Sequence, residues 1–182
     1  GATVFVEPQA VVEANARILQ YRAQEAQEIE RILVAFTAQV AAIEPQFQYS
    51  YKAMLEIDIL LAKARLALDQ GCEELDMVIN IGEMIRGNEA YVQDEIKQIC
   101  DLAHSRNAIV KVILETCYLT DAQKKRCCEL SEAAGADFVK TSTGYGTKGC
   151  TINDLKLMRA SVSDHVRVKG SGGIRDLDTV LA

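Results

Sequence analysis

The sequence predicts an α/β fold in which short parallel strands alternate with helices, and three observations carry that prediction. The first is a set of short runs rich in Val and Ile and bounded by Gly, Asn, Ser or Thr: residues 75–80, 109–114, 138–141 and 166–169. The second is a set of amphipathic segments between these runs: roughly residues 88–105, 121–134 and 151–160. The third is the regular spacing of the runs along the chain.

This spacing is close to 30 residues. Lys111 follows Asp76 by 35 residues, and Lys140 and Lys169 each follow after a further 29. Such a period with helices between the strands is typical of βαβ units and a parallel sheet. The period fits both an open sheet and a closed barrel. Glycine and polar residues after the strands favour the barrel, where such loops build active sites.

Two of the predicted helices carry start signals. Thr120 and Asp121 precede the helix that runs to Ala134, and Gly135 follows it in the position of a left-handed cap. In the next helix, Thr151 and Asp154 resemble a capping box.

The first 70 residues have a different character. We expect one partial barrel domain over residues 1–182, with a divergent helix-rich segment at about 9–70. Residues 3–6 have the composition of a strand, and the apolar runs 33–36 and 40–43 are candidates for another.

Two helical stretches accompany these candidate strands. Residues 9–32 are rich in Ala, Gln, Glu and Arg, and residues 52–70 place apolar side chains on one side of a helix. We expect the second helix to close at Gly71.

Composition is typical of one globular domain of a cytoplasmic protein, without a general affinity for nucleic acid or membranes. The 182 residues are 49% hydrophobic and 25% charged, with a formal net charge of −6, so nothing general attracts nucleic acid or acidic membranes. No run of about 18 uncharged apolar residues occurs, and the first residues lack the basic region of a signal peptide.

The six cysteines are scattered: Cys72, Cys100, Cys117, Cys127, Cys128 and Cys150. None forms a C-x-x-C pair, and with only two histidines in the chain a zinc or haem site is not expected. Reduced, buried thiols are the favoured interpretation over disulfides or redox chemistry.

Three ionisable residues lie inside predicted strands: Asp76, Lys140 and Lys169. Charged side chains are costly in parallel strands, whose two faces are normally buried. One strand lysine is explained equally well as a snorkelling side chain at a strand end. Two lysines and an aspartate at corresponding points of successive βα units favour a catalytic site.

Their chemistry is complementary. A lysine attacks a carbonyl as the neutral amine, so its pKa must fall below the ordinary value of about 10.4. Burial lowers the pKa of a lysine, and so does a second ammonium nearby. A pair of strand lysines, Lys140 and Lys169, would supply both effects. Asp76 can then move protons or position a water that does so.

A second constellation is glycine-rich. Residues 141–147 and 171–175 each follow a strand that carries one of these lysines. Backbone N–H groups in such turns, with the following helix N-terminus, favour a bound phosphate. Arg175 either assists there or is an ordinary surface residue. Glu115, at the end of a strand, is a candidate hydrogen-bonding residue of the site.

Four segments carry a resemblance to a known family: DMVINIG at 76–82, VKVILETC at 110–117, DFVKTSTGYG at 137–146 and VKGSGGIR at 168–175. Together they closely resemble 2-deoxyribose-5-phosphate aldolases, from about residue 60 to the carboxyl end. The resemblance implies a TIM (β/α)8 barrel without metal or organic cofactor. It also implies reversible cleavage of 2-deoxy-D-ribose 5-phosphate to D-glyceraldehyde 3-phosphate and acetaldehyde.

Matching positions imply roles for individual residues. Lys140 corresponds to the Schiff-base lysine, Lys169 to the lysine that lowers its pKa, and Asp76 to the proton-transfer residue. The supporting residues are Lys111, Glu115 and Thr141, and the phosphate-binding residues are Gly144, Gly172 and Gly173. We expect Lys111 to pair with an acidic neighbour, either Asp76 or Glu115. The chain itself is expected to be able to form a homo-oligomer.

The sequence also departs from the family pattern. The family's usual first strand and its last strand are not evident, so we expect about six of eight barrel strands here. Either residues are missing at both ends, or another element or chain replaces these strands. The segment 9–32 is one candidate to cover a sheet edge. Two alternatives to the active aldolase follow: a catalytically silent or truncated homologue with an assembly role, or a Schiff-base aldolase for another aldehyde.

Overall fold

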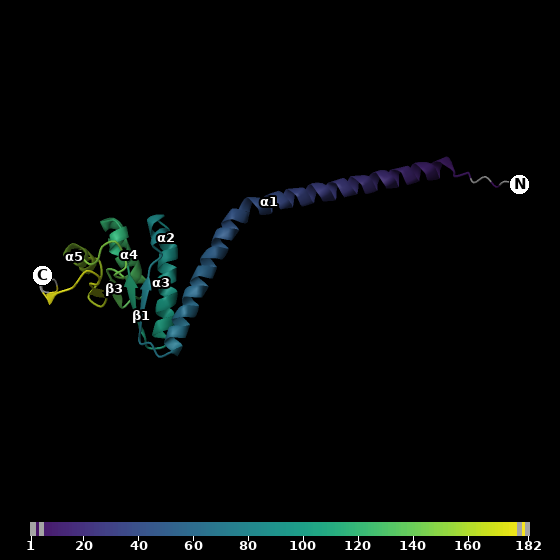
Figure 1. The fold of residues 1–182 in the computed structure, drawn as a ribbon. Helices are drawn as coiled ribbons and strands as arrows, with labels where there is room; N and C mark the ends of the chain where they lie inside the picture. Colours follow the sequence, from purple (N-terminus) through teal and green to yellow (C-terminus); the bar gives the residue numbers. More distant parts are fainter. Residues whose placement is uncertain (1–2, 4–5, 178–179, 181–182) are drawn as a thin grey trace. The chain divides into compact units, whose positions relative to one another are not determined.

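The computed structural model describes residues 3, 6–177 and 180 (Figure 1). It divides into two compact units, Gly1–Met54 and Leu55–Ala182. The first contains most of the long helix α1 (Gln9–Asp69), and the second contains the sheet and the remaining helices.

The sheet has four parallel strands in chain order: β1 (Glu74–Val78), β2 (Ile109–Ile113), β3 (Phe138–Lys140) and β4 (Arg167–Lys169). Strands β2, β3 and β4 lie within the runs predicted for them, and β1 begins one residue before its predicted run, so all four predicted strands are confirmed. Helices α3 (Glu89–His104), α4 (Asp121–Ala133) and α5 (Ile152–Ala160) confirm the three predicted helices between them.

One face of this sheet forms the core. Side chains alternate between faces along a strand, so Val110, Val112 and Val139 point the same way, and all three are fully buried. Helix α3 contacts β2, α5 contacts β4, and α4 contacts both α3 and α5. The apolar stripes of the three helices therefore cover one face and leave the charged residues on the other.

The ends of these helices follow from local chemistry. Thr120 forms a full capping box with Gln123, and the Thr151 hydroxyl accepts a hydrogen bond from the Asp154 backbone N–H. Gly135 has a φ of +93°, as a left-handed cap requires. Two short helices, α2 (Ile81–Ile85) and the 3-10 turn η1 (Thr116–Tyr118), were not predicted.

Helix α1 corrects the expectation of a strand over 33–36 and 40–43. Both runs lie inside the helix, which continues without interruption to Asp69 and includes Pro45. Four-residue apolar runs fit a strand and a helix equally well. The helix is favoured because residues 9–69 are rich in good helix formers and contain no glycine. The predicted stop at Gly71 is confirmed, with a φ of +85°.

The number of strands is also smaller than expected. Within the described ranges four strands are present, not six. The predicted strand at 3–6 lies partly outside the described residues, and Thr3 and Val6 belong to no strand. In the part of the chain that the structure describes, no helix is long and apolar enough to cross a membrane. All six cysteines are free; Cys100, Cys127 and Cys128 are buried, and Cys72 is exposed.

Candidate active site

The sheet face opposite the helices carries the ionisable residues that the sequence singles out. Asp76 is in register with Lys111, and Lys140 is in register with Lys169. Register partners on neighbouring strands project to the same face, about 5 Å apart at the backbone. The strand order therefore gathers the carboxylates of Glu74 and Asp76 and three lysine ammonium groups onto a single surface.

Lys140 bonds to Asp76 on this surface. Its Nζ donates to Asp76 Oδ2 at 2.9 Å, although β2 lies between their strands. The Lys140 side chain is 11% exposed and that of Asp76 is 41% exposed. The amine is thus enclosed, while the carboxylate remains open on its other side to water or a ligand.

Lys169 lies beside this pair. It is exposed, and it ends β4 directly across from Lys140, which ends β3. The two lysines therefore share a level of the sheet at its carboxyl edge, where parallel α/β folds build their sites.

Lys111 has a different partner from the two that we expected. Its buried ammonium pairs with Glu74, not with Asp76 or Glu115. Asp76 is engaged by Lys140, and Glu115 bonds to another loop, so Glu74 at the start of β1 is the available carboxylate. Phe138 lies next to this pair and also contacts the Arg167 guanidinium, 4.1 Å from the ring centre.

The glycine loops after β3 and β4 pack directly on each other. Gly144, Gly172 and Gly173 all have positive φ, between +78° and +94°. A Cβ built on Gly149 would lie 2.3 Å from the carbonyl oxygen of Gly172, and the Cys150 N–H donates to that oxygen at 3.0 Å. Only glycine fits at 149, so the close approach that brings together the three predicted phosphate-binding residues depends on it.

Thr141 joins the same two loops. Its hydroxyl donates to the Ser171 carbonyl at 3.1 Å and accepts from the Ser171 N–H at 3.0 Å. The Thr141 N–H in turn donates to the Lys169 carbonyl at 3.0 Å. Because Thr141 follows Lys140 in sequence, these bonds fix the carboxyl ends of β3 and β4 relative to each other.

Glu115 holds the first glycine loop from the other side. It is buried, adopts a left-handed φ of +53°, and its Oε2 accepts hydrogen bonds from the N–H and hydroxyl of Thr143. Its Oε1 and the Ser142 hydroxyl are buried without a hydrogen-bond partner among the described residues. The sequence indicated Glu115 as a site residue but carried no signal for its contact with Thr143.

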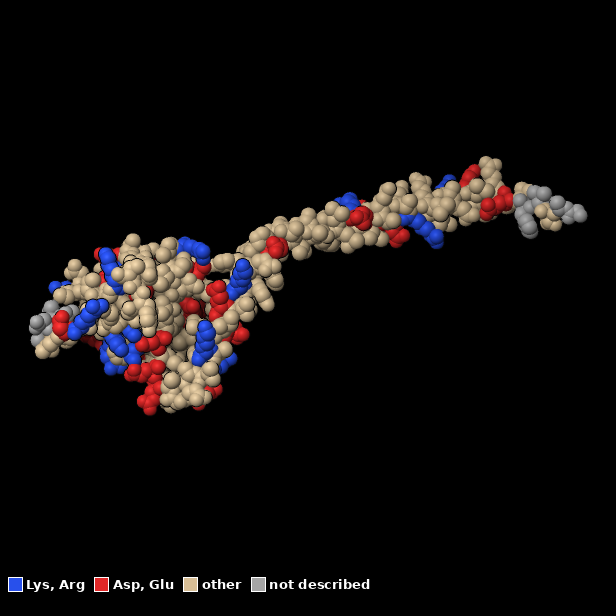
Figure 2. Space-filling view, in the orientation of Figure 1, with Lys and Arg blue, Asp and Glu red and all other residues tan. Residues whose placement is uncertain are grey.

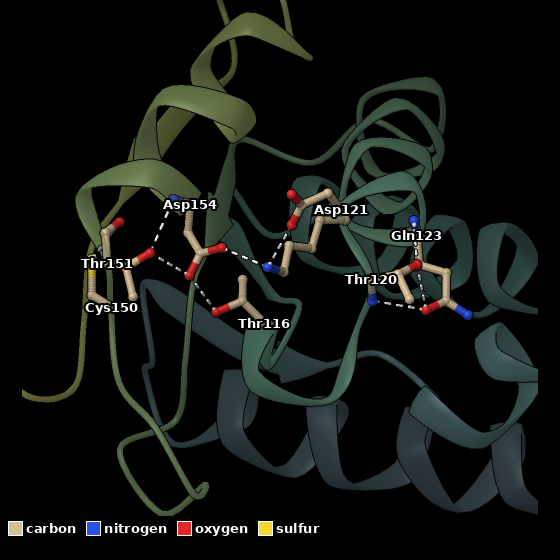
Figure 3. A network of polar contacts seen from close by, with 8 residues as sticks. Thr116, Thr120, Asp121, Gln123, Cys150, Thr151 and Asp154 are labelled. Carbon is tan, nitrogen blue, oxygen red and sulfur yellow. Dashed lines mark hydrogen bonds and ion pairs between the residues drawn. The ribbon is translucent and has the colours of Figure 1, made fainter.

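A polar network lies beside these loops (Figure 3). Lys124 Nζ bonds to Asp154 Oδ1 at 2.7 Å and to Asp121 Oδ1 at 2.9 Å, and the Thr116 hydroxyl donates to Asp154 Oδ2. Burial alone would raise the pKa of Asp154, but the bonds from Lys124 and Thr151 outweigh it and lower that pKa. These residues line part of an open cavity of about 380 Å³.

Sequence reasoning had no means to find this network, apart from the capping pair Thr151 and Asp154. Lys124 carries no local signal in the sequence, and only the tertiary structure brings Asp154 to it. Among the residues with described positions, no group of three His, Cys, Asp or Glu side chains has the arrangement of a metal site.

Comparison with known proteins identifies the family. A family model described as DeoC/LacD family aldolase matches residues 6–182. The deoxyribose-phosphate aldolases of Thermococcus gammatolerans and Thermococcus kodakarensis are 50% identical over 125 residues and 49% identical over 124. These matches cover 69% and 68% of this chain but 56% and 55% of the relatives. The chain thus spans about half the length of the curated relatives it matches.

Solved structures of aldolases also match this chain. An aldolase designated QR15 matches with a TM-score of 0.64 at 37% identity, over 69% of this chain and 56% of that one. The deoxyribose phosphate aldolase of Aeropyrum pernix matches with a TM-score of 0.60 at 36% identity, over 69% and 53%. The chain therefore belongs to the DeoC/LacD aldolase family, and its parallel sheet forms part of the TIM-barrel-type fold of these enzymes.

Proposed function

We propose that this chain carries the Schiff-base machinery of a class I aldolase that reversibly cleaves 2-deoxy-D-ribose 5-phosphate to D-glyceraldehyde 3-phosphate and acetaldehyde. The observation that carries the proposal is the enclosed Lys140 amine, 2.9 Å from the half-open Asp76 carboxylate, with Lys169 in register beside it. The names of the curated relatives supply the substrate.

In the proposed reaction Lys140 Nζ adds to the C1 aldehyde of the open-chain sugar phosphate. The resulting carbinolamine loses water to give a protonated Schiff base, with the proton for the departing hydroxide delivered through Asp76 or a water that it holds. Lys169, in register with Lys140, supplies a second positive charge at the same edge of the sheet.

Carbon–carbon cleavage follows from the Schiff base. Asp76, or a water that it holds, accepts the C3 hydroxyl proton as the bond between C2 and C3 breaks. The electron pair of that bond moves into the protonated Schiff base, so glyceraldehyde 3-phosphate leaves and the enamine of acetaldehyde remains on Lys140. Protonation at C2 returns a Schiff base. Addition of water then releases acetaldehyde and regenerates the free lysine.

The paired glycine loops are the proposed phosphate site. Gly144, Gly172 and Gly173 have backbone conformations that side chains rarely adopt, and turns of this kind direct N–H groups toward an anion. Thr141 and Glu115 hold the two loops in place through Ser171 and Thr143. This local arrangement supports binding of an anion by a chain whose formal net charge is −6.

Two further features belong to the proposal. The tetrameric structure of the Aeropyrum pernix relative supports assembly into a homo-oligomer. Six free thiols, three of them buried, support a reducing compartment such as the cytoplasm.

Reductive trapping tests the proposed chemistry. Borohydride added in the presence of acetaldehyde is expected to convert one lysine irreversibly to its N-ethyl form, and peptide mass mapping should place it at Lys140. Lys140→Ala should abolish the label, and Lys156→Ala, on the exposed side of α5, should retain it. Labelling spread over surface lysines, or none at all, would contradict a Schiff-base role. Trapping without turnover of deoxyribose 5-phosphate would point to another aldehyde or to a damaged site.

A further inference from the structure

Helix α1 exposes a long series of large apolar side chains within the unit Gly1–Met54. The largest include Leu33, Phe36 and Phe47, which are 56%, 60% and 68% exposed. Figure 2 shows charged groups at intervals along this helix, and over residues 32–51 the only charged residue is Glu44. An isolated helix gains little stability in water from such side chains, because helices depend on the burial of an apolar face.

These side chains follow a seven-residue repeat. One row recurs every seventh residue without exception: Val12, Leu19, Ala26, Leu33, Val40, Phe47 and Met54. A second row lies three residues further on: Asn15, Arg22, Ile29, Phe36, Ile43 and Ser50, of which the three central members are apolar. Alternating steps of three and four residues place both rows on one stripe, which we call the α1 seam.

The opposite side of the helix has a different composition. Its positions, also seven residues apart, are Arg17, Gln24, Arg31, Ala38, Pro45 and Lys52. Pro45 therefore lies on the outward side, where its missing N–H does not interrupt the seam. A seven-residue apolar repeat, with no large apolar side chain in the opposite row, is the pattern of a helix that packs against another helix of the same repeat.

We propose that the α1 seam binds the α1 seam of a second copy of this chain, with the two helices antiparallel. Antiparallel pairing that sets Leu33 against Phe36 of the second copy brings the two rows together along their whole length. The same register sets Ile29 against Val40 and Ala26 against Ile43. Each of these three pairs is apolar, and Ala26, the smallest side chain among them, meets the β-branched Ile43.

The polar members of the seam select this orientation. Arg22 would face Phe47 of the second copy, where a guanidinium packs favourably on an aromatic ring. Parallel pairing would instead set Arg22 against Arg22, and would bring Glu25 beside Glu30 of the other helix. Like charges at these positions are unfavourable, and the antiparallel register separates them.

The α1 seam has enough apolar surface for a stable interface between two copies. Nine large side chains on each copy are 49–71% exposed in the isolated helix. At about 60–120 Å² of apolar surface per buried side chain, pairing would remove roughly 1,000–2,000 Å² from water. Stable interfaces bury about 1,200–2,000 Å². The helix therefore supplies enough surface without a contribution from the sheet.

The oligomeric state of the full chain tests the pairing, with charge-matched variants. Light scattering after size exclusion should give at least two chain masses for the natural sequence. Phe36→Glu, in the seam, should halve that mass and weaken helical circular dichroism in a concentration-dependent way. Ala38→Glu introduces the same charge on the outward side and should leave both unchanged. A monomeric natural chain, or equal dissociation by both variants, overturns the proposal.

Disulfide formation tests the orientation. In the antiparallel register the double variant Ile29→Cys/Val40→Cys should form a bridge between position 29 of one copy and position 40 of the other, identified by peptide mass mapping under non-reducing conditions. The single variant Ile29→Cys should form no bridge between seam positions. A 29–29 bridge in that single variant would show parallel helices and overturn the antiparallel assignment. These readouts do not use catalysis, so they stand apart from the proposed aldolase activity.

Discussion

The Lys140 ammonium and the Asp76 carboxylate meet across an intervening strand. Lys140 ends β3, Asp76 is in the middle of β1, and their Nζ and Oδ2 atoms are 2.9 Å apart over β2. Their side chains meet over β2 because both project to the same face of a twisted sheet. The contact joins the two residues that the proposed reaction needs most closely together: the nucleophile and the group that moves its protons.

Asp76→Asn keeps a hydrogen-bond acceptor beside Lys140 but removes the charge and the capacity to carry a proton. We expect the rate of borohydride trapping with acetaldehyde to fall by about 10²–10⁴, the usual contribution of a positioned acid or base. Glu74→Gln makes the same chemical change at the neighbouring carboxylate that pairs with Lys111. Its effect on trapping should be much smaller. Equal losses from both variants would argue against a specific role for Asp76.

Lys169 is expected to act through its charge. Lys169→Met keeps the length of the side chain and removes the ammonium, so the positive charge beside Lys140 is lost. Trapping at neutral pH should slow by at least about tenfold, the effect of about 1.4 kcal/mol. Lys169→Arg retains the positive charge and should retain more of the rate. If the two variants trap equally fast, charge is not what Lys169 contributes.

Gly149 is expected to control phosphate recognition. In Gly149→Ala the new Cβ would meet the Gly172 carbonyl, at 2.3 Å in the present backbone, so the two glycine loops must separate. We expect weaker binding of inorganic phosphate, measured by calorimetry, with acetaldehyde trapping at Lys140 largely retained. Gly82→Ala is the control, because its nearest neighbour to the new Cβ is 3.4 Å away. Unchanged phosphate binding in Gly149→Ala would place the anion elsewhere.

Glu95 is expected to make folding stability depend on pH. Burial raises its pKa to about 7, opposed by a hydrogen bond from the Asn80 backbone N–H and assisted by the nearby Glu56 carboxylate. The folded state binds the Glu95 proton more tightly than the unfolded state does. The protonated carboxyl therefore adds its full share to the free energy of unfolding below about pH 4.5, and this share is lost as the pH rises through 7. Glu95→Gln removes this dependence.

Urea unfolding at pH 5 and pH 8 measures the difference. Between these values the natural chain should lose up to about 3 kcal/mol relative to Glu95→Gln, the energy of a shift of this size. The comparison within one variant pair cancels the other titrating groups, Asp154 among them. Parallel pH profiles for the two proteins would show that Glu95 titrates normally.

Local patterns predicted much of the unit that contains the sheet. Val- and Ile-rich runs located β1 to β4, and Thr120, Thr151 and Gly135 marked helix ends, because strand periodicity and capping depend on neighbours within a few residues. Asp76, Lys140 and Lys169 were recognisable as unusual because charge inside a parallel strand is rare. The same locality explains the error over 33–43, where a short apolar run carries too little information to separate a strand from α1.

What the sequence determined by itself is thus the alternation of strands and helices over residues 74–169 and the choice of Asp76, Lys140 and Lys169 as candidate site residues. The tertiary structure alone decided which residues meet. These pairs are Lys140 with Asp76, Lys111 with Glu74, Glu115 with Thr143, and Gly149 with Gly172. The physical reason is that these contacts join residues far apart in the chain. Strand register and the packing of loop on loop set their distances, and neither is encoded within any one segment.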